Sequence, residues 1–254
     1  MSRGVFGLDG QKILITGASS GIGRAAAQLA AAQGALCVIN GRDEARLNET
    51  LSTLNGKGHL AIVAGLTPDN CASIVKEAVQ ETGPLNGFVQ CAGIEKTLPF
   101  RMTELEELHQ IMSVNLDAYW EITKELLKKK NHEQGKLSVV AISSVAAQYG
   151  APGKTAYAAS KGAVISLTKS LAEEYANQKI RFNCVCPGYV DTPMQSGVRR
   201  LYKTKEDFEN AIVKKHLLGL GKPDDVASAI VYLLSEAAGW ITGSVMNVDG
   251  GYLG

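Results

Sequence analysis

A tyrosine and a lysine four residues apart could act together as a general acid–base pair. Tyr157 and Lys161 fall in a segment, 155–176, whose pattern predicts a helix, so the two side chains share one face of it. An ammonium about 4 Å from a phenol would lower the pKa of that phenol by up to ~3 units from its usual value near 10. Such a shift brings proton transfer within reach of neutral pH. Ser144 precedes Tyr157 by 13 residues at the end of a predicted strand, whereas a second Tyr-x-x-x-Lys pattern, at Tyr175, has no such serine.

A glycine-rich turn near the start of the chain could bind a pyrophosphate. Its glycines are Gly17, Gly21 and Gly23, and they lie between an apolar run ending at Thr16 and an alanine-rich helical pattern over 22–33. Glycine has no Cβ to obstruct the backbone amides and permits a positive φ. The helix that follows presents free N–H groups at its positive end. Strand, turn and helix occur in the order that a dinucleotide site needs; the alternative is a plain tight turn.

The residues that follow the second apolar run indicate which dinucleotide would bind. NAD-binding proteins usually place an acidic residue there to hold the ribose 2′-hydroxyl. This chain has Asn40, Gly41 and Arg42 instead. A guanidinium suits a 2′-phosphate, through charge-assisted hydrogen bonds, so NADP(H) is favoured over NAD(H). The alternative is that Arg42 only pairs with Asp43 or Glu44 on the surface.

Short apolar runs alternate along the chain with longer helical patterns. The runs predict strands over 11–16, 35–40, 59–63, 85–90, 137–142, 180–186 and 245–248. The patterns between them predict helices over 22–33, 43–54, 68–82, 103–130, 155–176 and 223–235, and Thr103 with Glu106 predicts a capping box at the start of the fourth. Alternation of this kind is typical of parallel βαβ units, whose strands are buried on both faces. We therefore expect an α/β fold, a single doubly wound domain over 1–254.

The ligand of such a domain lies beyond the carboxyl ends of the strands. Residues 187–220 follow one of these ends and are predicted to be irregular, with one short helix over 206–215. A long irregular segment in a compact domain usually has a function, and we interpret residues 188–220 as a substrate lid.

Composition and charge narrow the classes of function. The 254 residues include 26 Lys and Arg and 25 Asp and Glu, a formal net charge of +1. This balance argues against charge-driven binding of nucleic acid or a membrane, and no apolar run approaches the roughly 20 residues that span a bilayer. The start of the chain has no signal-peptide core, and the five cysteines do not form a disulfide pattern, so we expect a cytoplasmic protein. The four histidines share no ligand spacing, and we expect no metal.

Several motifs, in their order and spacing, resemble those of the short-chain dehydrogenase/reductase family. They are TGASSGIG (Thr16–Gly23), CAG (Cys91–Gly93), Val114–Leu116, Ile142–Ser144, Tyr157–Lys161, Cys186–Gly188 followed by Thr192, and Ile241–Gly251. The resemblance covers essentially the whole chain. It implies a Rossmann-type fold with a seven-stranded parallel sheet and helices on both faces, and assembly as a homotetramer.

The resemblance also implies a catalytic tetrad of Asn115, Ser144, Tyr157 and Lys161. Tyr157 would give a proton to the substrate oxygen, and Ser144 would donate a hydrogen bond to it. Lys161 would also hold the nicotinamide ribose, Asn115 would hold a water that relays protons to Lys161, and the cofactor would supply the hydride. The implied cofactor contacts are Gly17, Ser19, Ser20, Gly21, Ile22, Gly23, Arg42, Ala92, Gly93, Tyr157, Lys161, Pro187, Gly188, Val190 and Thr192.

Some positions depart from the family pattern. Gln90 and Cys91 stand where the family commonly has two asparagines, and Gly65 stands where an aspartate usually contacts the adenine. Ser20 stands where some NADP-type members have a basic residue. The NADP(H) prediction therefore rests mainly on Arg42.

We thus predict an NADP(H)-dependent oxidoreductase that acts on a carbonyl–alcohol pair. Segments 94–100, 146–150 and 189–220 would form a mostly apolar substrate pocket. Within the family, a 3-oxoacyl-carrier-protein reductase and a sugar or polyol dehydrogenase using NAD(H) both remain open. A nucleotide-binding regulatory module without turnover is a further alternative, and the intact tetrad argues against it.

A basic patch lies on the predicted lid. It consists of Arg199, Arg200, Lys203 and Lys205. Such a patch could attract a carrier-bound acyl chain through its acidic carrier, or a phosphorylated substrate. The alternative, a solvated helix face, is slightly preferred.

Overall fold

One parallel sheet runs through the protein. The computed structural model describes residues 4–200 and 202–253, and within them seven strands form a single sheet in the order β3-β2-β1-β4-β5-β6-β7. Every neighbouring pair is parallel. The strands are β1 (Lys12–Thr16), β2 (Leu36–Gly41), β3 (Leu60–Val63), β4 (Gly87–Gln90), β5 (Ser138–Ile142), β6 (Arg181–Pro187) and β7 (Val245–Val248). The expected seven-stranded sheet of a Rossmann-type α/β fold is confirmed.

Strand β1 shows why the strands are almost continuously apolar. Ile13 and Ile15 belong to the hydrophobic cluster on one face of the sheet, and Leu14 belongs to the cluster on the other. Successive side chains of a strand point to opposite faces, and all three are fully buried here. Because both faces are covered, neither tolerates a row of polar side chains.

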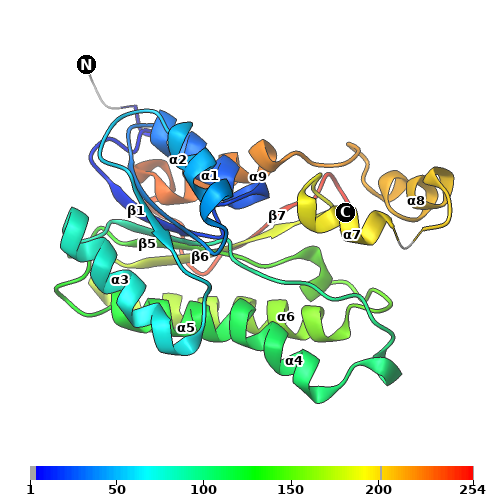
Figure 1. Cartoon of the computed structure of the whole chain (residues 1–254). Helices are drawn as coiled ribbons and strands as arrows, with labels where there is room; N and C mark the ends of the chain where they lie inside the picture. The colour runs from blue at the N-terminus through cyan, green and yellow to red at the C-terminus, as the bar shows by residue number, and fades with distance from the viewer. Residues whose placement is uncertain (1–3, 201, 254) are drawn as a thin grey trace.

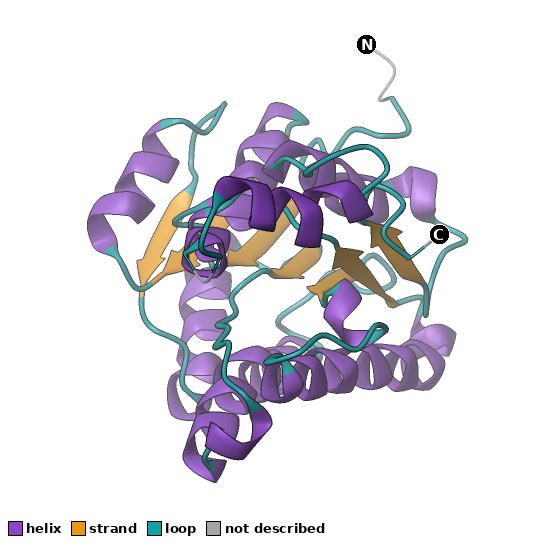
Figure 2. Cartoon of the chain, turned by 90° about the vertical axis from the view of Figure 1, so that its right-hand side faces the viewer, coloured by secondary structure: helices purple, strands orange, loops and turns teal. Residues whose placement is uncertain are grey.

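Helices cover both faces of the sheet. Helices α1, α2 and α9 lie on one face, and α3, α5 and α6 lie on the other, with α4 beside α6 (Figure 1). The bounds are α1 (Gly21–Ala32), α2 (Glu44–Ser52), α3 (Pro68–Thr82), α4 (Leu105–Met112), α5 (Ala118–Leu126), α6 (Thr155–Tyr175), α7 (Pro193–Arg199), α8 (Lys205–Ala211) and α9 (Pro223–Leu234). Helices α7 and α8 extend past the sheet, on the side that faces the viewer in Figure 2.

The helix predicted to open with Thr103 and Glu106 opens one residue later. Glu104 caps α4, and its amide donates to the Glu107 carboxylate at 3.0 Å. Thr103 belongs to the end of the preceding 3₁₀ turn, where its hydroxyl donates to the Pro99 carbonyl. The predicted register of the capping box was wrong because that turn already uses the threonine hydroxyl.

The long helix predicted as far as residue 130 is interrupted. A π-helical turn over Ser113–Asp117 separates α4 from α5, and α5 ends at Leu126. A π turn accommodates an extra residue without breaking the helical rod, so apolar periodicity did not reveal it. Asn115 lies in this turn with no exposed surface.

The stretch after β6, predicted to be irregular, contains two short helices. Helix α7 was not predicted; Thr192 precedes it, and Pro193 occupies its first turn, where proline needs no amide hydrogen. The helix predicted over 206–215 is α8, which ends earlier because Ile212 leaves helical backbone angles.

Candidate active site

Two neighbouring cavities lie at the carboxyl ends of the strands. The first, of about 330 Å³, lies between the β1–α1 turn, the end of β2 and the loop after β4. The second, of about 400 Å³, lies between the loops after β4 and β5 and the segment after β6. Ile22, Cys91, Gly93, Thr192 and Met194 line both. The cavities are therefore contiguous, and they lie at the edge of the sheet where a ligand was expected.

All residues predicted to contact a cofactor line one of these cavities. The first cavity is lined by Gly17, Ser19, Ser20, Gly21, Ile22, Gly23, Arg42, Ala92, Gly93 and Thr192. The second is lined by Tyr157, Lys161, Pro187, Gly188 and Val190, together with Ser144. The segments expected to form the substrate pocket contribute Ala146, Tyr149 and Met194, among others, to the lining of the second cavity.

The glycine turn packs against the loop after β4 more closely than side chains would allow. A Cβ on Gly17 would lie 2.7 Å from the backbone of Ala92, and one on Gly23 would lie 2.4 Å from the Gly17 carbonyl oxygen. Gly17 also has a φ of +66°, which strains residues with a side chain. The Thr16 hydroxyl donates to Gln90 at 2.9 Å and accepts from the Ala92 amide at 3.2 Å. Gln90, where the family commonly has asparagine, thus helps to join the ends of β1 and β4.

The first cavity is complementary to phosphate groups. Ser20 caps α1 without a side-chain hydrogen bond, and the first turn carries no acidic residue. The free amides and the positive end of the helix dipole attract an anion. Arg42 and Arg46 add two guanidinium groups to the lining, which includes no Asp or Glu among residues 4–200 and 202–253. Asn40, which also lines this cavity, has a buried Oδ1 with no hydrogen-bond partner in that part of the chain.

Arg42 is not tied to its acidic neighbours. The Asp43 carboxylate caps α2 and pairs with Arg46 at 2.8 Å. Within the described ranges, no carboxylate lies within ion-pair distance of Arg42. The alternative of a surface pair with Asp43 or Glu44 is therefore not seen. The glycine cradle and the free cation together fit a phosphate-bearing dinucleotide.

Tyr157 and Lys161 lie on one face of α6, as predicted, and both line the second cavity. Their exposed fractions are 8% and 3%. Lys161 Nζ lies 5.9 Å from the centroid of the Tyr157 ring and donates to the Ile142 carbonyl at 2.8 Å. The ammonium is thus held at the end of β5.

Burial dominates the acidity of both groups. It raises the pKa of Tyr157 above its ordinary value, and the Glu95 carboxylate raises it further, whereas a hydrogen bond with the Ser144 side chain acts in the opposite direction. Burial lowers the pKa of Lys161 to about 8. The predicted lowering of the phenol pKa is therefore wrong for this structure. Desolvation of the phenolate outweighs the attraction of an ammonium that is bound to Ile142.

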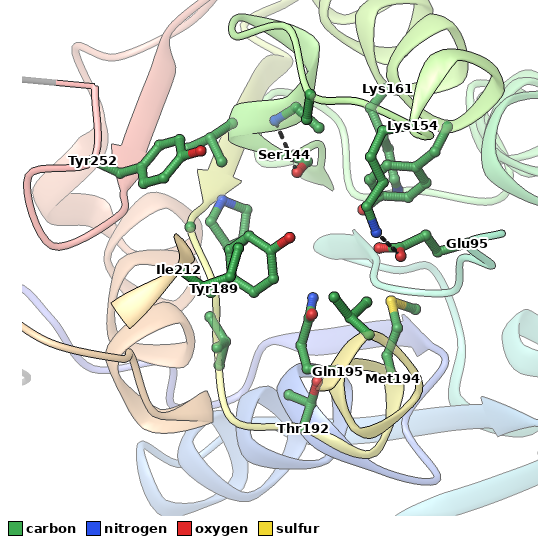
Figure 3. A pocket seen from close by; sticks show the side chains of 18 of the residues that line it. Glu95, Ser144, Lys154, Lys161, Tyr189, Thr192, Met194, Gln195, Ile212 and Tyr252 are labelled. Atoms are coloured by element: carbon green, nitrogen blue, oxygen red, sulfur yellow. Dashed lines mark hydrogen bonds and ion pairs between the residues drawn. The ribbon is translucent and has the colours of Figure 1, made fainter. Parts of the chain in front are cut away.

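Ser144 lies where the chain leaves β5. It begins a 3₁₀ turn, and its Oγ accepts a hydrogen bond from the Ala146 amide at 3.1 Å (Figure 3). Its neighbour Ser143 donates to the Lys161 carbonyl at 2.8 Å. These bonds fix the start of the turn and the middle of α6 relative to each other, so the serine, tyrosine and lysine side chains share one cavity.

Asn115, unlike the other tetrad residues, lies behind the cavity wall. Its Oδ1 accepts from the Ile94 amide at 2.8 Å, and its Nδ2 donates to the Ile94 carbonyl at 3.0 Å and to Ser160 Oγ at 2.9 Å. Both N–H bonds are used, so the amide holds the loop after β4 in position. The relay water implied by the family resemblance stays a prediction.

Sequence reasoning missed a buried ion pair in the second cavity. Lys154 Nζ bonds the Glu95 carboxylate (Figure 3), and each side chain is only 8% exposed. The segment that contains Glu95 was expected to contact substrate, but its partner lies 59 positions along the chain. No local pattern connects residues so far apart.

His216 was also missed, because an isolated histidine in a polar stretch carries no sequence signal. It is 3% exposed. Its Nδ1 bonds the Ile212 carbonyl at 2.9 Å, and its Nε2 accepts from the Tyr189 amide at 3.0 Å. Its ring also contacts that of Tyr252, with 4.7 Å between centroids. His216 thereby joins the end of the predicted lid to the segment after β6 and to the carboxyl-terminal residues.

Comparison with known proteins gives the family. A family model described as enoyl-(acyl carrier protein) reductase matches residues 17–253. The chain belongs to the short-chain dehydrogenase/reductase family. This short-chain dehydrogenase/reductase is 35% identical to the 3-oxoacyl-(acyl-carrier-protein) reductase FabG of Thermotoga maritima over 252 residues, which cover 96% of this chain and 98% of the relative.

Solved structures agree with this assignment. A short-chain dehydrogenase/reductase from Brucella melitensis, described as a glucose/ribitol dehydrogenase, is 32% identical, with a TM-score of 0.88 over 96% of this chain and 97% of that one. An actinorhodin polyketide ketoreductase with NADPH is 29% identical, with a TM-score of 0.90 over 95% and 97% of the two chains. The protein is therefore an oxidoreductase of this family. These relatives differ in the substrates that their names give.

Within residues 4–200 and 202–253, no cluster of three His, Cys, Asp or Glu side chains is placed to bind a metal ion. No helix there combines the length and apolar character needed to cross a bilayer.

Proposed function

We propose that this short-chain dehydrogenase/reductase transfers hydride between NADP(H) and a carbonyl–alcohol pair, with Tyr157 as the general acid and base. One observation carries the proposal. Tyr157, Ser144 and Lys161 line a cavity that continues into the glycine-walled cavity beside Arg42. A substrate carbonyl beside Tyr157 and Ser144 would thus lie next to a bound nicotinamide.

Each side chain has a physical role in this reaction. When bound, the dinucleotide supplies the hydride to the carbonyl carbon. The raised pKa of Tyr157 keeps its hydroxyl protonated near neutral pH, which is the form that can donate a proton to the developing alkoxide. The Ser144 hydroxyl can donate a hydrogen bond to the same oxygen and stabilise its charge. Lys161, with a pKa of about 8, stays mostly charged at neutral pH and can hold ribose hydroxyls.

The cofactor preference rests on charge at the far end of the first cavity. Arg42 and Arg46 line it and no carboxylate does in the described ranges. A guanidinium forms strong, bidentate hydrogen bonds with phosphate, whereas recognition of an unphosphorylated ribose usually employs an acidic side chain. These features support NADP(H) over NAD(H).

The wider organisation belongs to the same proposal. Residues 1–254 would form one catalytic domain of a cytoplasmic enzyme, with 188–220 as the substrate lid. Large apolar side chains exposed on α4, α5 and after α9, such as Leu105, Trp120 and Trp240, are 65%, 53% and 100% exposed. A contiguous apolar patch would mark a subunit contact, and the homotetramer itself is proposed from the family resemblance. Light scattering after size exclusion tests the assembly.

Tyr157→Phe tests the proposed chemistry. The variant keeps the ring and loses the proton donor, so we expect NADPH-dependent reduction of a ketone substrate to fall by about 10²- to 10⁴-fold while NADPH binding is nearly unchanged. Tyr175→Phe is the matched control, because Tyr175 has the same spacing to a lysine but packs against Phe182. Normal turnover in Tyr157→Phe would contradict the proposal.

A further inference from the structure

A buried ion pair lies in the wall of the second cavity. Val145, Met194 and Val198 are among the apolar residues that line the cavity, whereas Glu95 and Lys154 meet on one side of it. In Figure 3 the pair lies across the cavity from Tyr252, and the Lys154 ammonium is directed at the Glu95 carboxylate. Each side chain is 8% exposed.

Several contacts hold this wall in place. The Thr97 hydroxyl donates to Glu95 Oε1 at 3.2 Å. The Leu98 amide donates to the Gly153 carbonyl at 3.0 Å, which joins the two loops that carry the ion pair. Ile94, next to Glu95, is bonded through both its amide and its carbonyl to Asn115. The pair is therefore preorganised by its surroundings, as a binding site requires.

Stability alone does not account for the pair. Removing two charges from water costs free energy that their mutual attraction often only offsets, and an apolar replacement of similar volume is frequently as stable. The pair also leaves hydrogen-bonding capacity unused. Thr97 and Lys154 both bond Oε1 of Glu95, and Oε2 has no partner in the described part of the chain. Lys154 Nζ, with three N–H bonds, has Glu95 as its hydrogen-bond partner there.

The pair lies close to the reacting group. Lys154 precedes Tyr157 by three residues, at the start of α6. The charge of Glu95 raises the pKa of both Tyr157 and Tyr189, which lie on different walls of the same cavity. Tyr157, Glu95 and Lys154 thus line one cavity, and a substrate whose carbonyl contacts Tyr157 can extend toward the ion pair.

We propose that Glu95 and Lys154 bind a hydroxyl group next to the reacting carbonyl, so that hydroxylated carbonyl compounds and polyols are the substrates of this enzyme. The inference rests on the proposed function. A hydroxyl is both donor and acceptor, and it matches a free carboxylate oxygen beside a free ammonium N–H. The pair itself is neutral overall, so any attraction for an anionic group would come from Lys161 and Lys215, which also line the cavity. An unsubstituted acyl chain would cover these polar atoms and leave them without partners, which is unfavourable.

The kinetic test compares two substrates of the same carbon skeleton. Dihydroxyacetone and acetone are reduced with NADPH by the native protein and by the double variant Glu95→Leu/Lys154→Met, which replaces the pair with apolar groups. Because a hydrogen bond to a charged group contributes about 1.5–3 kcal/mol, we expect the ratio of the two kcat/KM values to fall by roughly 10- to 100-fold in the double variant. Using the ratio cancels the intrinsic reactivity of each ketone.

Lys96→Met is the matched control. Lys96 lies in the same loop as Glu95 and pairs with Glu107 of α4. Its side chain is half-exposed and does not line the cavity. We expect the substrate ratio of this variant to equal that of the native protein. A double variant that keeps the native ratio would overturn the inference, as would a native protein that reduces the acetoacetyl thioester of N-acetylcysteamine more efficiently than dihydroxyacetone.

A binding test separates this inference from the proposed chemistry. Glycerol and isopropanol are titrated by calorimetry into native protein saturated with NADPH, where no hydride acceptor is present. We expect glycerol to bind more tightly to the native protein and this preference to disappear in the double variant. If the native protein prefers glycerol but does not reduce either ketone, the proposed function is refuted and the hydroxyl site is not. If the native protein binds glycerol and isopropanol equally, the hydroxyl site is refuted.

Discussion

The buried ammonium of Lys161 gives the folded protein a measurable dependence on pH. Burial lowers the pKa of Lys161 from 10.5 to about 8 in the folded chain, where the side chain is 3% exposed. The unfolded chain keeps this proton up to pH 10.5, whereas the folded chain releases it near pH 8. Between these values the unfolded state binds more protons, so the free energy of unfolding rises with pH. Lys161→Met removes the titrating group and abolishes this contribution.

The magnitude follows from the shift itself. Each unit of pKa corresponds to 1.36 kcal/mol, so a pKa lowered from 10.5 to about 8 gives a total of about 3 kcal/mol. Between pH 7 and 9.5 the gain is about 2 kcal/mol, and the other titrating groups, which both proteins share, largely cancel in the comparison. The native protein is thus expected to gain this much stability relative to Lys161→Met as the pH rises from 7 to 9.5.

Urea unfolding at fixed protein concentration measures the effect. The free energy of unfolding is determined for both proteins, without cofactor, at intervals between pH 7 and pH 9.5, and the difference between them is plotted. We expect this difference to be nearly constant below pH 7.5 and then to rise with a slope approaching 1.36 kcal/mol per pH unit. A difference that stays flat over the whole range would mean that Lys161 titrates normally, and it would refute the role assigned to burial.

Three further substitutions test the site. Arg42→Ala is expected to weaken NADPH binding by roughly 10- to 100-fold with little effect on NADH; fluorescence titration with both cofactors measures this, and equal losses would count against the phosphate contact. Gly17→Ala places a Cβ 2.7 Å from the Ala92 backbone at a φ of +66°, so we expect a loss of about 1–3 kcal/mol of stability and weaker NADPH binding, and unchanged urea unfolding would argue against the close packing. Asn115→Ala removes both bonds to Ile94, and we expect about 1–3 kcal/mol less stability together with a raised KM for substrate; an unaltered KM would mean that the loop keeps its position without the asparagine.

Much of the fold followed from local patterns. The run Lys12–Thr16 is short, apolar and followed by a glycine turn, and such a segment is stable mainly when helices cover both its faces. The predicted boundaries of the fourth helix were wrong for a different reason. A π turn around Asn115 and an alternative cap at Glu104 depend on hydrogen bonds that apolar spacing does not report.

The candidate site could likewise be predicted only in part from the sequence. Gly17, Ser144, Tyr157 and Lys161 could be placed from sequence because each lies at a fixed offset from a strand end or along one helix face. The acidity of Tyr157 could not, because it depends on burial and on the charge of Glu95, which is far away in the chain.

The amino-acid sequence by itself determined the order of strands and helices, the glycine turn that fits a pyrophosphate and the spacing of the reactive side chains. These features depend on residues that are neighbours along the backbone. Only the tertiary structure decided that Lys161 bonds the Ile142 carbonyl, that Arg42 is left free by an Asp43–Arg46 pair, and that Glu95 and Lys154 meet in the cavity. These interactions depend on how closely separate segments approach one another and on how much water is excluded around them. Neither quantity can be read from the sequence before the chain is folded.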